Sequence, residues 1–238
     1  MTTYSPSWPH SDIKQIFPNV FMVTGTNITQ FAGSDLQHSR NMIIVRQNGE
    51  LSLINTVRLT PQGLNALEAL GKITNVIRIG AFHGRDDAFY LDRYKATLWA
   101  LPGMVHENNK TTDIELTEQG QMPFAKCSLF VFETSVHKEG CLLLDQEGGI
   151  LITCDSIKNW VDADEFFSDE SAKLYASQGF FGQATISTVW LDACQVKQTD
   201  FERLLKLKFH HLLSAHGEPL LNQAQEKLKE TISTIKNW

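Results

Sequence analysis

The sequence contains no hydrophobic run long enough to cross a membrane, and its first residues, Met1 to Pro6, carry neither a basic start nor an apolar segment. A membrane-spanning helix needs about 20 consecutive apolar residues, and a secretory signal needs a basic segment followed by an apolar one. We therefore expect no membrane attachment and no secretory signal, and we expect the protein to be cytoplasmic.

Cysteine is scarce and lacks the spacing of a metal or redox motif. The four cysteines are Cys127, Cys141, Cys154 and Cys194, and no two of them form a Cys-x-x-Cys pair. Disulfide frameworks and zinc knuckles are recognised by such regular spacing. Its absence argues against both, and we expect buried, reduced thiols.

Positive charge is also in short supply. Lysine and arginine number 21 against 27 aspartates and glutamates, the formal net charge is -6, and the sequence has no basic stripe. Proteins that bind nucleic acid normally carry one, so we expect a small-molecule partner and no nucleic acid. The length, and a content of 42% hydrophobic and 20% charged residues without a linker-like segment, indicate a globular protein of one large domain or two small ones and leave the oligomeric state open.

The first half of the chain alternates between strand and helix patterns. After a turn-rich lead-in over residues 1–18, strands are predicted at 20–23, 41–46, 51–57, 74–79 and 97–101, and helices at 60–70 and 86–95. Asn48-Gly49 is the strongest hairpin signal, and Thr60-Pro61 is typical of a helix start. Residues 25–39 are polar and predict a loop, long enough to be a lid over a site.

The second half returns to strands and ends in a helix. Strands are predicted at 127–132, 140–144, 149–153 and 212–215, and helices at 200–207 and 222–235. Residues 157–195 mix aromatic and acidic side chains and predict a helical insertion, in which aromatic residues are more often core than a substrate platform. The alternation of strands and helices indicates the α/β class.

Histidine and aspartate recur where predicted strands end. His83 is followed by Asp86 and Asp87 after one strand, Asp155 and His216 each follow another, and His137 comes just before one. Neutral imidazole and carboxylate are the groups that hold zinc, iron or manganese, and such a metal lowers the pKa of a water molecule. These residues also have plainer interpretations: Asp86 as the N-cap of the helix that follows, Asp87 as a first-turn carboxylate, Asp155 as a turn cap, and His137 as a solvated turn residue.

These segments resemble the motifs of the metallo-β-lactamase-fold superfamily over roughly residues 17–235. The family has His-x-His-x-Asp-His after a strand, a Gly-His-Thr-x-Gly-like segment, an aspartate at a strand end, and a late His-Gly. Segments 135–140, 151–155 and 213–219 are similar to the last three. The resemblance implies a four-layered αββα sandwich, in one domain over residues 1–238, and a metal site.

The first motif is incomplete. With His83 in its first position, Asp87 falls on the motif aspartate, but Arg85 and Ala88 replace the second and third histidines. An arginine cannot ligate a metal and repels one. We therefore expect at most a mononuclear centre.

The leading hypothesis is a metal-dependent hydrolase of unknown substrate. The resemblance implies that His83, Asp87, His137, Asp155 and His216 share one divalent metal, zinc before iron or manganese. Asp87 and His216 would be the catalytic residues, and Arg85 would bind an anionic group of an ester, thioester, amide or phosphoester substrate.

The alternative is a non-catalytic, metal-free protein on the same scaffold. In it, Arg85 pairs with Asp87 and Asp155 in the space of the former metal and binds an anionic ligand. A third interpretation, an iron-dependent oxidoreductase, has no support in these residues.

Overall fold

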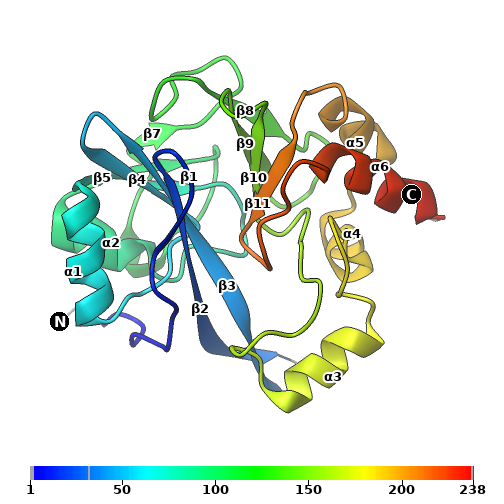
Figure 1. The fold of residues 1–238 in the computed structure, drawn as a ribbon, viewed down its shortest axis with the longest axis horizontal. Helices are drawn as coiled ribbons and strands as arrows, with labels where there is room; N and C mark the ends of the chain where they lie inside the picture. Colours follow the sequence, from blue (N-terminus) through cyan, green and yellow to red (C-terminus); the bar gives the residue numbers. More distant parts are fainter. Residues whose placement is uncertain (1–2, 32, 237) are drawn as a thin grey trace.

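The larger of two β-sheets has seven strands that pair in chain order (Figure 1). The computed structural model describes residues 3–31, 33–236 and 238; Met1 and Thr2 of the predicted signal-free N-terminus lie outside this range. The strands are β1 (Lys14–Phe17), β2 (Val20–Phe31), β3 (Ser34–Gln47), β4 (Glu50–Ile54), β5 (Lys72–Arg78), β6 (Thr97–Ala100) and β7 (Ile114–Glu115). β1 to β4 are antiparallel, and β4 to β7 run parallel.

The smaller sheet has four strands in the order β11-β10-β9-β8. They are β8 (Cys127–Val131), β9 (Gly140–Leu144), β10 (Ile150–Thr153) and β11 (His211–Ser214). β10 and β11 are parallel, so the chain leaves both strands at the same end of the sheet. This arrangement brings the residues that follow the two strands together.

Three hydrophobic clusters separate four layers. One lies between the two sheets, where side chains such as Ile43, Ile77, Leu142 and Ile152 are fully buried. A second joins the outer face of the larger sheet to α1 (Pro61–Leu70) and α2 (Asp87–Tyr94). A third joins the smaller sheet to α4 (Thr188–Cys194), α5 (Gln198–Leu204) and α6 (Ala224–Thr234). The predicted α/β class and αββα sandwich are confirmed.

Most of the turn and capping residues recognised in the sequence have the predicted role in the structure. Asn48 and Gly49 have φ of 53° and 79°, as the two central residues of a tight β3–β4 hairpin require. Thr60 caps α1 by accepting a hydrogen bond from the Gly63 amide at 3.3 Å. Asp86 occupies the N-cap position of α2 without capping it, because its carboxylate accepts from the Arg58 amide instead.

The loop predicted over residues 25–39 is wrong. Residues 25–31 and 34–39 form the outer half of a long β2–β3 hairpin, paired from Val20–Val45 to Phe31–Ser34. The outer half of β3 is exposed or half-buried on both faces, so its sequence shows no alternation of apolar and polar residues. Figure 1 shows the hairpin reaching past the sandwich to α3 (Asp169–Ser177).

The segment predicted as a helical insertion, residues 157–195, contains α3 and α4. Trp160, Tyr175 and Phe180 form a buried aromatic cluster within it, with Leu36 of the hairpin packed alongside. A short 3-10 helix, η1 (Glu107–Asn109), and β7 lie in the stretch 104–124, for which no element was predicted. No helix within the described residues is both long and apolar enough to cross a membrane.

Candidate metal centre

Three side chains from three strand ends converge on one point. His83 follows β5 of the larger sheet, and Asp155 and His216 follow β10 and β11 of the smaller one. Nε2 of His83 lies 3.1 Å from Nε2 of His216, which lies 3.1 Å from Oδ1 of Asp155. Asp155 Oδ2 lies 3.4 Å from His83 Nε2. The point therefore sits between the sheets, at the edge where the parallel strands end.

Backbone contacts hold His216 in place. Its amide donates to Ser214 Oγ at 3.1 Å, and its carbonyl accepts from the Asn159 amide at 2.9 Å. Gly217 has φ of 90° and its Cα lies against the Asn159 backbone, so no side chain fits there. The late His-Gly pair thus has a mechanical reason: the glycine permits the turn that presents the histidine.

The His216–Asp155 contact brings two hydrogen-bond acceptors together. His216 Nδ1 faces the Ser39 carbonyl at 3.2 Å, so Nδ1 carries the proton and Nε2 presents a lone pair. Burial lowers the pKa of both His216 and His83, which leaves the rings neutral. Burial acts to raise the pKa of Asp155, but the buried ammonium of Lys158, 3.5 Å from Oδ1, favours the charged form; the pKa lies well below its usual range and the carboxylate stays ionised.

These distances suit a bound cation. A tetrahedral zinc with bonds of about 2.0–2.2 Å holds its ligand atoms roughly 3.3–3.6 Å apart, close to the separations of 3.1 to 3.4 Å found here. A cation between lone pair and carboxylate removes their repulsion. Two imidazoles and one carboxylate leave a fourth position for water or substrate, as catalytic zinc sites do. Cys154, with Sγ 3.7 Å from Asp155 Oδ2, belongs to the same cluster.

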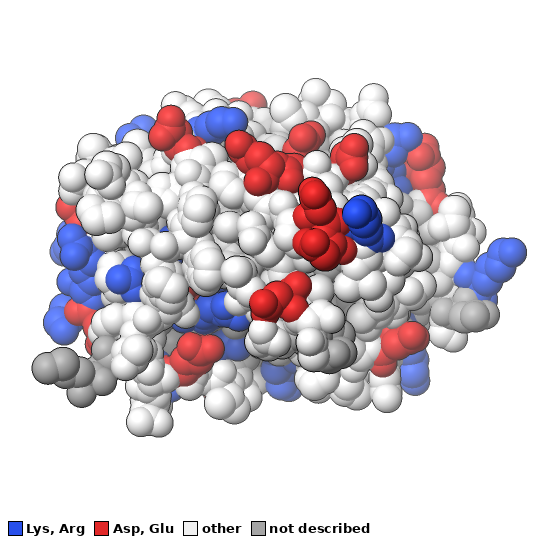
Figure 2. All heavy atoms as spheres, turned by 90° about the horizontal axis from the view of Figure 1, so that it is seen from below, with Lys and Arg blue, Asp and Glu red and all other residues white. Residues whose placement is uncertain are grey.

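The three ligand atoms open into a polar pocket of about 220 Å³. Its other walls are Asn27, Thr29, His38, Arg40, Phe82 and Arg85. On the face that α3 borders, acidic and basic side chains are interspersed with wide uncharged areas (Figure 2).

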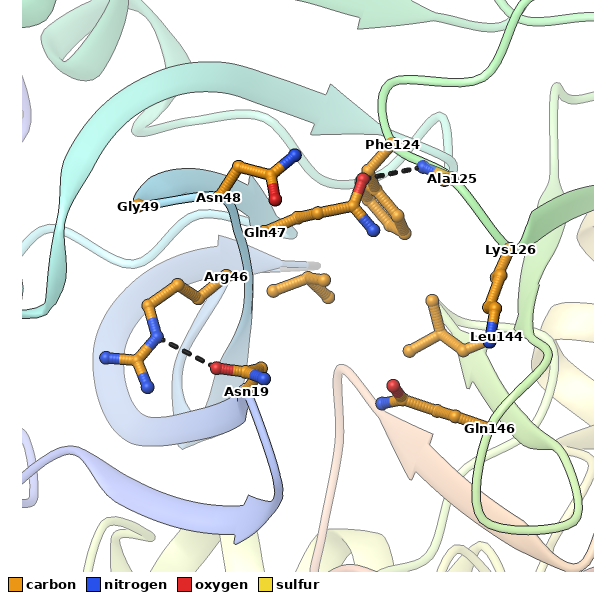
Figure 3. A pocket seen from close by; sticks show the side chains of 11 residues that line it. Asn19, Arg46, Gln47, Asn48, Gly49, Phe124, Ala125, Lys126, Leu144 and Gln146 are labelled. Carbon is orange, nitrogen blue, oxygen red and sulfur yellow. Dashed lines mark hydrogen bonds between the residues drawn. The ribbon is translucent and has the colours of Figure 1, made fainter.

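A second polar pocket, of about 240 Å³, lies at the opposite end of the sandwich (Figure 3). Its polar groups bond one another: Gln47 accepts from the Ala125 amide, and Arg46 donates to Asn19 at 3.0 Å. Its lining residues include no acid and no histidine. It therefore lacks the groups that hydrolysis or metal binding requires.

No protein-family model and no curated protein matches the chain significantly. Solved structures do match. The DIM-1 metallo-β-lactamase exposed to ceftazidime has 14% identity and a TM-score of 0.62, covering 96% of this chain and 99% of that one. FIM-1 from Pseudomonas aeruginosa in its mono-zinc form has 14% identity and a TM-score of 0.58, covering 95% and 96%. The chain has the metallo-β-lactamase fold. An enzyme from Erythrobacter litoralis matches similarly, with 13% identity, a TM-score of 0.57 and coverage of 94% and 92%.

Within this fold, three of the five expected ligands meet and two lie elsewhere. Asp87 is buried in the first turn of α2, where Oδ1 accepts from Thr56 Oγ1 at 2.6 Å and burial raises its pKa. His137 is exposed, and its ring lies 5.1 Å from that of Phe82. Neither belongs to the converging cluster.

Arg85 does not enter the space between the ligands. It donates to the Ile28 carbonyl at 3.2 Å and to Thr29 Oγ1 at 3.0 Å, on the β2–β3 hairpin. Within the described part of the chain it forms no ion pair with Asp87 or Asp155. The hairpin, which the sequence did not predict, supplies the partners that draw this side chain to the rim.

Two residues of the hairpin were missed as site residues. His38 and Arg40 line the polar pocket and are two apart on β3, so they share a face of the strand. Arg40 donates to the Thr56 carbonyl at 2.6 Å and lies 3.6 Å from Asp86. Burial lowers the pKa of His38 to about 3. Had the strand been recognised, the two-residue spacing would have placed His38 and Arg40 on the same face.

Lys158 was also missed. It is buried, and Nζ lies 3.5 Å from Asp155 Oδ1. Only its nearness to Asp155 in sequence pointed to it, and nothing in its surroundings resembles a motif. With Arg40, which lines the polar pocket, it places two buried positive charges near the converging side chains.

Proposed function

We propose that this protein is a metal-dependent hydrolase with a single metal ion held by His83, Asp155 and His216. The observation that carries the proposal is the meeting of two neutral imidazole nitrogens and one ionised carboxylate at 3.1 to 3.4 Å, with two acceptors face to face. Zinc suits this ligand set best. It would supply Lewis acidity for water and for a substrate carbonyl or phosphoryl oxygen.

The protein groups around the ligands have separate roles in this proposal. Arg40 and Lys158, both buried beside the ligands, attract negative charge that develops on the substrate. Arg85, at the rim, binds an anionic group that extends from the pocket. His38, neutral because burial lowers its pKa to about 3, offers a hydrogen-bonding nitrogen without adding charge.

Asp87 and His137 are not ligands in this proposal, although both were expected to be. Asp87 supports the site indirectly: it accepts a hydrogen bond from the Thr56 hydroxyl, and the carbonyl of the same Thr56 accepts one from Arg40. His137 covers Phe82, a neighbour of His83 in sequence.

Metal content tests the proposal. Protein purified without chelator is analysed by elemental analysis, beside His216→Ala and the matched control His137→Ala. We expect about one zinc per chain in the native protein and in His137→Ala, and loss of metal in His216→Ala. Ester, thioester and phosphoester panels then follow on the metal-loaded protein.

The competing function is metal-free anion binding, favoured by the buried charges of Arg40 and Lys158. A native protein that takes up no zinc, iron or manganese even when these are supplied, but binds phosphate or acetate, would establish it and overturn the hydrolase. In that case Arg40→Met should abolish anion binding, because Arg40 lies deeper in the pocket than Arg85.

A further inference from the structure

An apolar pocket of about 380 Å³ adjoins the candidate metal centre. Its walls are Leu36 of β3, Leu174 and Tyr175 of α3, Phe180, and Val189 and Trp190 of α4. This size falls in the range of small-molecule sites, and hydrocarbon walls with few polar groups are typical of them.

The two pockets are continuous. Thr29, His38, Phe82 and Asp155 line both of them. A ligand with its polar end among the metal-binding residues therefore directs whatever is attached to that end toward α3 and α4. Lys158 marks the boundary, since its ammonium lies 3.5 Å from Asp155 and 5.4 Å from the centre of the Phe180 ring.

The mouth of the apolar pocket exposes large hydrophobic side chains. Leu174, Val189 and Phe82 are 37%, 46% and 54% exposed. Each gains from being covered by hydrocarbon, at about 25 cal/mol per Å² of apolar surface removed from water. Because these residues surround a cavity rather than a flat face, a small occupant reaches more of them than a protein surface does.

We propose that the apolar pocket holds the acyl chain of a carboxylic ester or thioester whose carbonyl group lies at His83, Asp155 and His216. The proposal rests on the hydrolase function proposed above and adds a substrate class to it. In the reaction, water adds its oxygen to the acyl carbon and the acyl C–O or C–S bond breaks. The alcohol or thiol leaves with one proton, and the carboxylic acid releases the other.

The test is the dependence of turnover and binding on acyl length. We expect kcat/KM for para-nitrophenyl esters, from acetate to decanoate, to rise about three- to fourfold per methylene until the pocket is full. The matching carboxylates are titrated by calorimetry, and octanoate should bind at least tenfold more tightly than acetate.

Two matched variants assign the effect to this pocket. Val189→Glu places a carboxylate at the mouth and should flatten the length dependence. Leu221→Glu alters a leucine of similar exposure, 44% against 46%, outside the pocket, and should leave it unchanged. Equal rates and affinities for all chain lengths in the native protein, or a length dependence that survives Val189→Glu, would overturn the proposal.

Metal uptake and turnover of the native protein, measured beside its carboxylate binding, separate this proposal from the hydrolase. In native protein supplied with zinc, length-dependent carboxylate binding without metal uptake or turnover would retain the acyl pocket and reject hydrolysis. Turnover that does not depend on acyl length would retain the hydrolase and reject the acyl pocket. Octanoate binding that disappears on dilution together with a dimer would assign the exposed side chains to a second copy of the chain and reject the acyl site.

Discussion

Arg78 holds the loop that carries His83, and its replacement should weaken both the fold and the metal centre. The side chain is only 8% exposed and faces no carboxylate within ion-pair distance in the described structure. Its guanidinium instead donates to three backbone carbonyls, those of Gly80 at 3.3 Å, Ala81 at 2.7 Å and Val105 at 2.7 Å. Gly80 and Ala81 lie in the loop between β5 and His83.

The expected cost of Arg78→Met follows from these bonds. A buried group left without its partner costs about 1–3 kcal/mol, and the Val105 carbonyl lies in an exposed segment where water replaces the lost donor. We therefore expect about 3 kcal/mol, which in a chain of this length lowers Tm by about 6–12 °C. Arg78→Lys should lose less, because an ammonium keeps the charge but not the planar fork.

Thermal unfolding in chelator measures the loss of stability, and zinc affinity measures whether the loss of Arg78 also disturbs His83. Arg93→Met is the control, since Arg93 is half exposed on α2 and its pair with Glu68 is worth less than about 1 kcal/mol. A fall in Tm no larger than that of Arg93→Met would refute the assigned bonds. We also expect zinc binding to weaken about 10- to 100-fold, as when the groups that orient a ligand are lost. Unchanged zinc affinity would show that the loop does not position His83.

Two further predictions concern ionisation. In chelator, His38 should make the free energy of unfolding fall by about 2 kcal/mol from pH 7 to pH 5, because its ring gains a proton in the unfolded chain but not in the folded one, where its pKa is about 3. The pH dependence should become flatter in His38→Gln and change less in His137→Gln. Equal pH dependence in the two variants would contradict the burial of His38. Burial raises the pKa of Cys127 to about 12 and that of Cys194 to about 11, so at pH 8 fewer than about one in a thousand of these thiols is ionised, and iodoacetamide should label them only after denaturation; rapid labelling of the native protein would refute this.

Most of the fold could be predicted because its signals are local. Runs such as Val20–Val23 and Leu212–Ala215 are buried strands, and the Asn48-Gly49 turn needs nothing but its own two residues. The outer β2–β3 hairpin could not be predicted in the same way. Its pairing is held by backbone hydrogen bonds that any residue makes, while most of its side chains face water or a pocket and Leu36 packs on the aromatic cluster.

The residues of the candidate site also differ in how far local sequence could predict them. His83, Asp155 and His216 were predictable as candidates, since each follows a recognisable strand, and the parallel pairing of β10 and β11 brings the last two together. Where Asp87 and Arg85 point depends on Thr56 and on the hairpin, which are distant in sequence. Sequence spacing contains no information on such tertiary partners.

The same geometry bears on how many metal ions the proposed centre would hold. Arg40 is buried beside Asp86, and Lys158 is buried beside Asp155, so each of these two carboxylates has a fixed positive neighbour. In a medium of low dielectric constant, a cation next to such groups meets repulsion of several kcal/mol unless enough ligands compensate. The three converging ligand atoms can compensate for one divalent ion. A second ion would have to rely on Asp86 or Asp87, of which the first already faces Arg40 and the second accepts a hydrogen bond from Thr56. In the proposed hydrolase, therefore, Arg40 would limit the site to one metal more than the missing histidines of the first motif do.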